Sequence, residues 1–224
     1  MQIAIDGPSG AGKSTLAKML AKKLGFIYVD TGALYRAIGL YCERKSTDIN
    51  DNKAIINELP NIKLELAYRD GVQHVLLCGE DVSAEIRTPS ISEWASKVSA
   101  IGEVRSFLLK IQREIAETNN VIMDGRDIGT VILPNADVKI FLKSSLAERA
   151  KRRRIEYAEK GMAVSMDEVT KMLDERDTRD STRKIAPLVP ADDAIELDSS
   201  DLTIEQTFYA ALEIIKNRSG MILQ

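Results

Sequence analysis

The stretch GPSGAGKS, residues 7–14, matches the pattern G-x-x-x-x-G-K-[S/T] and decides the fold expected of this chain. It follows an apolar run, QIAI (residues 2–5), and precedes a helical stripe of apolar residues that begins near Ser14. Glycines let such a loop curl until its backbone N–H groups point at phosphate oxygens, and the following helix adds a favourable dipole. We therefore predict a phosphate-binding loop (P-loop) for a nucleoside triphosphate, made of Gly7, Pro8, Ser9, Gly10, Ala11, Gly12, Lys13, Ser14 and Thr15.

Two side chains of this loop have predicted roles in nucleotide binding. Lys13 would reach the β and γ phosphates, and the hydroxyl of Ser14 would ligate Mg²⁺. A later apolar run, VIMD (residues 121–124), ends on Asp124, which is placed like a Walker-B aspartate that orients Mg²⁺ through water.

Short apolar runs alternate with helical periodicity, which predicts an α/β protein with a parallel sheet. The expected strands are residues 2–5, 26–30, 121–124, 137–142 and 194–198. The pattern differs in the middle of the chain, where two runs of strand period, residues 62–68 and 72–77, flank Asp70-Gly71. That arrangement is typical of a β-hairpin. We expect a small β-rich insert at about residues 60–82.

Composition excludes several classes of function. The net charge of −3 argues against general affinity for nucleic acid or acidic membranes. His74 is the single histidine, so histidine-based triads and multi-histidine metal sites are not expected. Cys42 and Cys78 match no metal-binding or redox spacing. No secretory signal or membrane span is visible. We expect a cytoplasmic protein with no nucleic-acid or membrane partner.

A P-loop leaves open a kinase of a small acceptor, a GTPase-type switch and a mechanical ATPase. The sequence contains no D-x-x-G, and its single Asn-Lys pair, Asn52-Lys53, continues as Ala-Ile rather than toward N-K-x-D. The chain is also short for a mechanical ATPase. The kinase hypothesis is therefore favoured.

Arginines follow the expected strands where open α/β sheets bind ligands. DTGALYR (residues 30–36) places Arg36 on a helix after the second strand, and DGRDIGT (residues 124–130) places Arg126 and Asp127 after the third. A phosphate acceptor has a second pKa of about 6, so it is mostly ionised at neutral pH and needs no general base. It needs arginines that hold it in line for transfer.

Seven motifs together resemble those of bacterial cytidylate kinases: GPSGAGKST, DTGALYR, GEDVSAEIRT, DGRDIGT, KIFL, ERDTRDSTR and APLVPA. The resemblance extends from about Ile3 to Leu212. It implies an ATP-dependent enzyme that phosphorylates CMP, and also dCMP, with Mg²⁺. It also implies a three-layer α/β nucleoside monophosphate (NMP) kinase fold with a five-stranded parallel sheet, a β-rich NMP-binding insert and a helical lid.

The resemblance and the sequence pattern together predict a domain layout. The core comprises residues 1–33, 103–147 and 186–224. Residues 34–102 form the NMP-binding region, and residues 148–185 form the lid. The stretch DERDTRDSTRKIAPLVP (residues 174–190) contains the end of the lid and the return of the chain to the core. We expect a monomer.

The resemblance also assigns substrate contacts. Arg36 and Arg126 would bind the acceptor phosphate, and Arg179 would join a charge clamp over the transferring group. The cytosine base would be framed by Arg105, Asp127 and Arg183, with a further contact from Thr31. The pentose would be held by Ser96, Arg176 and Asp180. The predicted catalytic residues are Lys13, Arg126, Arg179 and Asp124.

Two positions depart from the family pattern. Ser14 stands where some members have glycine, so here either its hydroxyl or that of Thr15 could ligate Mg²⁺. Thr31 stands where serine is common, and its hydroxyl is retained. Asp127 and the arginines suit the exocyclic amine of cytosine, which favours CMP over UMP. A guanylate or uridylate kinase and a non-catalytic nucleotide-binding regulator remain alternatives.

Overall fold

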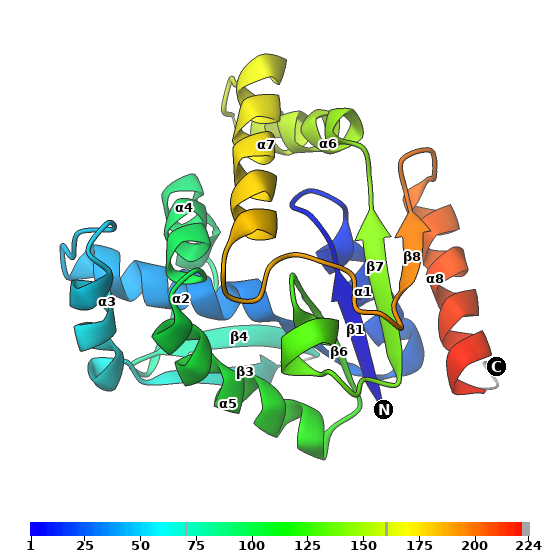
Figure 1. Ribbon diagram of the computed structural model, residues 1–224, viewed down its shortest axis with the longest axis horizontal. Coiled ribbons are helices and arrows are strands. Elements are labelled where there is room, and N and C mark those ends of the chain that lie inside the picture. Colours follow the sequence, from blue (N-terminus) through cyan, green and yellow to red (C-terminus); the bar gives the residue numbers. More distant parts are fainter. Residues whose placement is uncertain (70, 160, 221–224) are drawn as a thin grey trace. The chain divides into compact units, whose positions relative to one another are not determined.

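The computed structural model describes residues 1–69, 71–159 and 161–220. The chain divides into two compact units, the first made of Met1–Phe26 with Ile122–Gln224 and the second of Ile27–Val121. Five strands form a parallel sheet in the order β2-β6-β1-β7-β8, and three form a second sheet in the order β3-β4-β5 (Figure 1). The α/β class and the five-stranded sheet predicted from the sequence are confirmed.

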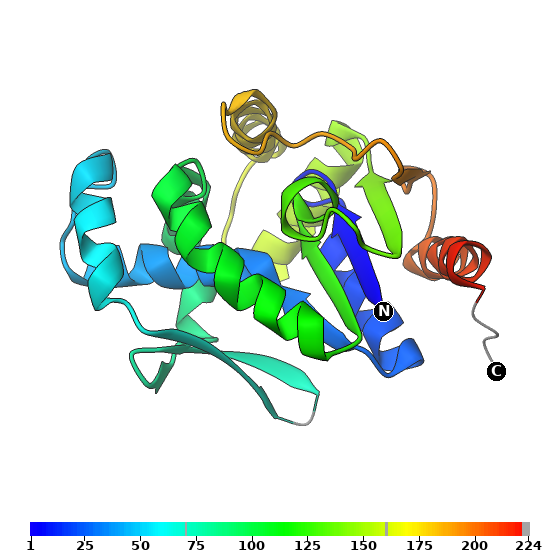
Figure 2. The same cartoon turned by 60° about the horizontal axis from the view of Figure 1, so that its bottom comes forward.

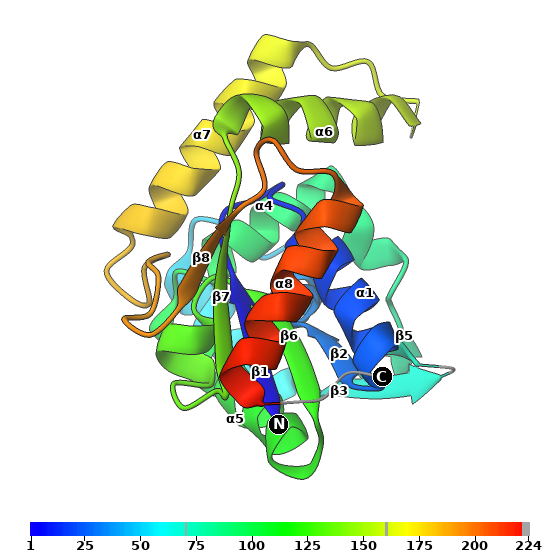
Figure 3. The same cartoon turned by 90° about the vertical axis from the view of Figure 1, so that its right-hand side faces the viewer.

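The first unit contains the P-loop strand and the C-terminal half of the chain. Its elements are β1 (Gln2–Asp6), α1 (Lys13–Leu24), β6 (Val121–Gly125), the π-helical turn η3 (Ile128–Ile132), β7 (Val138–Lys143), α6 (Leu146–Glu159), α7 (Met166–Thr182), β8 (Ile195–Asp198) and α8 (Ile204–Ser219). β1 pairs with β7 in parallel, with Ile5 opposite Ile140. Apolar runs form these strands because both faces of the sheet are covered. Figure 3 shows α1 and α8 side by side over one face.

Helices α6 and α7 pack against each other through a small apolar cluster of Ala150, Val169 and Leu173. The Ser165 side chain and Glu168 form a capping box that begins α7. The Ser145 hydroxyl accepts a hydrogen bond from the Glu148 N–H at 3.3 Å at the start of α6. Both caps satisfy backbone N–H groups at the start of a helix.

The second unit has its own core. Its elements are β2 (Ile27–Asp30), α2 (Thr31–Arg44), α3 (Asn52–Glu58), η1 (Leu59–Asn61), β3 (Leu64–Arg69), β4 (Val72–Leu77), β5 (Glu80–Asp81), η2 (Glu85–Arg87), α4 (Pro89–Val98) and α5 (Gly102–Thr118). Helices α2 and α4 approach so closely that a Cβ on Gly39 would lie 2.5 Å from the Trp94 Cβ. This contact explains the glycine in the middle of α2.

The predicted hairpin is confirmed as β3 and β4, two adjacent antiparallel ribbons in Figure 2. Asp70, half of the predicted Asp-Gly turn, lies outside the described residues. His74 is on β4, half-buried, with Nδ1 2.7 Å from a carboxylate oxygen of Asp81. It therefore belongs to the small sheet. Among the helices within the described ranges, none combines the length and the apolar character needed to cross a membrane.

Candidate active site

The P-loop connects β1 to α1, as the motif predicts. Gly7 has a φ of 149°, and a Cβ there would lie 2.2 Å from the Leu142 carbonyl oxygen, so no larger residue fits. Lys13 begins α1, is buried, and donates a hydrogen bond from Nζ to the Pro8 carbonyl at 2.7 Å. Burial, together with the nearby Arg126 guanidinium, lowers the pKa of Lys13 well below the usual lysine value. Phosphate oxygens placed here would restore a favourable environment for its charge.

The Ser14 hydroxyl donates a hydrogen bond to a carboxylate oxygen of Asp124 at 2.9 Å. Ser14 lies on the first turn of α1, and Asp124 lies near the end of β6. A hydroxyl beside a carboxylate supplies the hard oxygen donors that suit Mg²⁺, which is usually held by one or two carboxylates and substrate phosphates. These two residues therefore fit the predicted metal role, and Ser14 rather than Thr15 is the residue bonded to Asp124.

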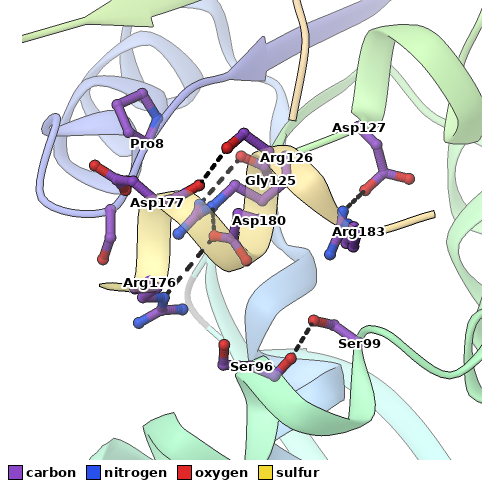
Figure 4. A network of polar contacts seen from close by, with 12 residues as sticks. Pro8, Ser96, Ser99, Gly125, Arg126, Asp127, Arg176, Asp177, Asp180 and Arg183 are labelled. Carbon is purple, nitrogen blue, oxygen red and sulfur yellow. Dashed lines mark hydrogen bonds and ion pairs between the residues drawn. The ribbon is translucent and has the colours of Figure 1, made fainter. Parts of the chain in front are cut away.

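An arginine–aspartate network joins the turn after β6 to helix α7 (Figure 4). Arg126 Nε donates to Asp180 Oδ2 at 2.8 Å, and Arg176 Nε lies 4.0 Å from the same oxygen. Arg183 Nη2 lies 3.5 Å from Asp127 Oδ1. Asp180 is only 4% exposed. Burial alone would raise the pKa of Asp180, but the charges of Arg126 and Arg176 outweigh it and lower that pKa.

Arg179 lies on α7 with the other predicted lid residues but is exposed. The structure thus brings together Arg126, Asp127, Arg176, Asp180 and Arg183, and places Arg179 at the surface of the same helix. Its predicted place in a charge clamp stays a prediction.

Two arginines of α6 contact the P-loop backbone. Arg149 is buried and donates to the carbonyls of Ser9 at 3.1 Å and Ser144 at 2.9 Å, and it also pairs with Asp177. Arg152 donates to the Ser199 carbonyl at 2.9 Å and approaches the Ala11 carbonyl at 3.5 Å. Planar guanidinium groups suit this bridging because they donate in several fixed directions. The base of the predicted lid is thereby attached to the phosphate loop.

In the second unit, Asp30 is the centre of a polar cluster at the start of α2. Its carboxylate accepts hydrogen bonds from the Ala33 N–H at 3.0 Å and from Arg87 Nη1 at 2.7 Å, and Arg36 Nη1 lies 3.4 Å away. Burial acts to raise the pKa of Asp30, but Arg36 and Arg87 outweigh it and lower that pKa. Gln73 of β4 exchanges two hydrogen bonds with the Asp30 backbone. The β insert is thus attached to the helix that carries Thr31 and Arg36.

The other two predicted residues of this unit lie on α4 and α5. Ser96 is buried, and its hydroxyl has no hydrogen-bond partner within the described part of the chain. Arg105 is buried, donates to the Ser99 carbonyl at 3.2 Å, and lies over the ring of Tyr35 with its guanidinium carbon 5.7 Å from the centroid. Figure 4 shows the hydrogen bond that the Ser99 hydroxyl donates to the Ser96 carbonyl at the C-terminal end of α4.

Sequence comparison places this site in a known family: the family model described as cytidylate kinase matches residues 3–217. The chain belongs to the cytidylate kinase family. The Lactobacillus johnsonii cytidylate kinase is 49% identical over 218 residues, which cover 97% of this chain and 95% of that protein. The one from Caldicellulosiruptor saccharolyticus is 51% identical over 214 residues, with 96% and 95% covered. The one from Carboxydothermus hydrogenoformans is 47% identical over 222 residues, with 99% and 100% covered.

The resemblance predicted from the motifs is therefore confirmed, and the chain is an enzyme of the cytidylate kinase family. Among solved structures, a shikimate kinase from Bacteroides thetaiotaomicron matches 96% of this chain and 98% of its own, with a TM-score of 0.51 and 16% identity. At that identity the likeness concerns the fold alone, and it supports the α/β architecture.

Sequence reasoning missed several polar residues of this cytidylate kinase family member. Asp30 and Arg87 lie within quoted motifs, but neither was assigned a contact. Arg152 and Asp177 lie in charge-rich helical segments, where any one charge is normally solvated. Their partners are far away in sequence, so spacing alone gives no signal for them.

Proposed function

We propose that this chain transfers the γ-phosphoryl group of ATP to CMP or dCMP and releases ADP with CDP or dCDP. The observation that carries the proposal is the match of residues 3–217 to the cytidylate kinase family, in a chain whose P-loop unit also holds a buried arginine–aspartate network. A P-loop alone would suit many nucleotide-binding proteins. The network supplies the groups that an anionic acceptor needs.

On the donor side, the P-loop N–H groups and Lys13 bind the ATP phosphates. Lys13 sits at the positive end of α1, where anions are stabilised. Ser14 and Asp124 would hold Mg²⁺, which would offset the charge of the phosphates when bound. Arg149 and Arg152 hold the loop backbone in place from α6. These residues orient the donor for in-line transfer.

On the acceptor side, Arg126 and Arg36 bind the phosphate of CMP. Each is paired with a buried carboxylate, Arg126 with Asp180 and Arg36 with Asp30. These pairs keep the guanidinium groups oriented, and a bound phosphate would share their remaining donors. The acceptor phosphate is already ionised at neutral pH, so no side chain has to remove a proton. Arginine charge, with Arg179 joining the clamp, stabilises the transferring group.

Selection of the base rests on Asp127, with Arg183 and Arg105. A buried carboxylate accepts a hydrogen bond from the exocyclic amine of cytosine but meets a carbonyl at the same place in uracil. Such a mismatch in a buried site costs about 1–3 kcal/mol. Asp127 is 3% exposed and close to Arg183, so its carboxylate is held rather than free to turn away. Thr31 would add a contact to the base, and Ser96, Arg176 and Asp180 would hold the pentose.

We assign helices α6 and α7 to a lid of residues 148–185, and residues 34–102 to NMP binding. Mixed-sign charges along α7 would let its arginines exchange aspartate partners for phosphate oxygens when a lid closes. The monomeric state and the absence of nucleic-acid partners stay predictions.

The test is direct detection of products by ³¹P NMR, with ATP, Mg²⁺ and one acceptor at a time from CMP, dCMP, UMP, AMP, GMP and shikimate. We expect a nucleoside diphosphate product with CMP and dCMP. Product from GMP or UMP at the CMP rate would identify a different NMP kinase. Binding of ATP with no product from any acceptor would indicate a regulator.

A further inference from the structure

Asp6 is a buried carboxylate with no role in the proposed reaction. It ends β1 and directly precedes the P-loop, and it is 6% exposed. Its Oδ1 accepts a hydrogen bond from the Ile128 N–H at 2.8 Å, and its Oδ2 accepts one from the Gly129 N–H, also at 2.8 Å. One side chain thus binds two consecutive backbone amides 122 and 123 positions away in sequence.

The two amides belong to the turn that follows Arg126 and Asp127. This turn is the π-helical segment η3, in which the Asp127 carbonyl accepts hydrogen bonds from Val131 at 2.9 Å and Ile132 at 3.2 Å. Asp6 therefore binds the first two N–H groups of η3, which have no partner inside the turn. The position of η3 in turn fixes the backbone that carries the predicted phosphate-binding arginine and base-reading carboxylate.

Lys139 of β7 also packs against this turn. A Cβ on Gly129 would lie 3.0 Å from the Lys139 Cδ and 3.4 Å from Asp6 Oδ2. The Lys139 side chain is itself fixed, since its Nζ donates to the Pro134 carbonyl at 2.6 Å and to Asp193 at 2.7 Å. Gly129 therefore packs against two side chains that hydrogen bonds hold in place, which leaves the turn little room to shift.

A carboxylate is the side chain of this size that can accept both hydrogen bonds. Asparagine would offer one acceptor and one N–H₂ donor, and the donor would face a backbone N–H. Burying a carboxylate is unfavourable, and desolvation raises the pKa of Asp6 to about 6 despite both amide bonds. The charged groups that face it are Lys13 on α1 and Asp127 on the turn. The two amide hydrogen bonds of Asp6 offset part of this cost, and they are the contacts through which it can act on the site.

We propose that Asp6 is a positioning residue that fixes the turn bearing Arg126 and Asp127 relative to the P-loop, and so sets acceptor affinity and the preference for CMP over UMP. The inference rests on the proposed function. Asp6 directly precedes the P-loop, so one residue next to the donor site would position the backbone that carries the acceptor-binding residues.

The test is Asp6→Asn, assayed by steady-state kinetics with CMP and UMP and by amide hydrogen exchange. We expect the KM for CMP to rise about tenfold, the change that losing one buried charged hydrogen bond brings. The CMP-to-UMP ratio of kcat/KM should fall, while the KM for ATP should change by less than about threefold. Exchange at Ile128 and Gly129 should become faster, a readout that needs no catalysis.

Asp137→Asn is the matched control. Asp137 is an exposed carboxylate of the same unit that also accepts a backbone hydrogen bond, from the Gln2 N–H at 2.7 Å. We expect it to leave the CMP kinetics and the Ile128 and Gly129 exchange unchanged. Gly129→Ala is a second variant, which disturbs the same contact at the residue that donates the hydrogen bond to Asp6. It should also raise the KM for CMP.

The proposal is overturned if Asp6→Asn leaves the KM for CMP and both exchange rates at wild-type values. It is also overturned if KM rises equally for both nucleotides together with a loss of melting temperature, since that result describes a merely structural residue. Wild-type protein without CMP-dependent turnover would instead overturn the proposed function. In that case the exchange comparison still decides whether Asp6 holds the turn.

Discussion

Replacing Asp6 by asparagine should change how the stability of this protein depends on pH. Desolvation by burial raises the pKa of Asp6 from 3.8 to about 6, against the opposing effect of the Gly129 and Ile128 amides. Between these two values the folded chain binds a proton at Asp6 that the unfolded chain does not bind. The stability from this proton is therefore present at low pH and is lost as pH rises through about 6.

The magnitude follows from the two pKa values. At about pH 5 the extra proton stabilises the folded state by about 1.4 kcal/mol, and at about pH 7.5 its contribution is close to zero. Asparagine does not titrate. The free energy of unfolding of the variant minus that of the wild type should therefore increase by about 1.4 kcal/mol from pH 5 to pH 7.5.

The assay is urea denaturation followed by far-UV circular dichroism at several pH values for both proteins. Repeating it in low and high salt separates burial from charge–charge effects, because screening weakens the latter. A difference that stays constant to within about 0.3 kcal/mol would show that folding does not raise the pKa of Asp6. A slope of opposite sign would show that the two amide hydrogen bonds outweigh desolvation at Asp6.

Three further predictions concern the ATP-binding side of the site. Gly7→Ala places a Cβ 2.2 Å from the Leu142 carbonyl oxygen. We therefore expect a lower melting temperature and no ATP binding by calorimetry. ATP binding at the wild-type level would contradict the close approach of Gly7 to Leu142. Ser14→Ala should raise the Mg²⁺ concentration for half-maximal activity about tenfold, whereas Thr15→Ala should change it less than about twofold; equal effects would contradict the assignment. Arg149→Lys keeps the charge but loses the planar guanidinium group that donates to the Ser9 carbonyl. We expect the KM for ATP to rise about fivefold while the KM for CMP stays constant. An unchanged KM for ATP would show that Arg149 does not hold the P-loop in place.

Local patterns predicted most of the fold. The apolar runs before Asp6 and before Asp124 became the buried strands β1 and β6, because a strand covered on both faces needs apolar residues throughout. The strand β5 was missed because its two residues, Glu80 and Asp81, are exposed and polar. The turn η3 was missed because its shape depends on a carboxylate from a distant strand rather than on its own sequence.

The candidate site could be predicted only where a motif carries the chemistry. The P-loop is such a motif, because its glycines and Lys13 have to stand at fixed spacing around phosphates. The pairings Arg126–Asp180 and Arg183–Asp127 depend on the approach of segments more than fifty residues apart. Sequence reasoning selected all four residues, but it could not say which partner each would have.

The preference of this chain for CMP is measured by the ratio of kcat/KM for CMP to kcat/KM for UMP. A coupled assay of ADP release with saturating ATP and Mg²⁺ measures both values on the same preparation. Because a mismatch at Asp127 costs about 1–3 kcal/mol, we predict a ratio of about ten or more. A ratio near one, or ADP release that does not depend on CMP, would show that the chain is not a CMP-selective kinase.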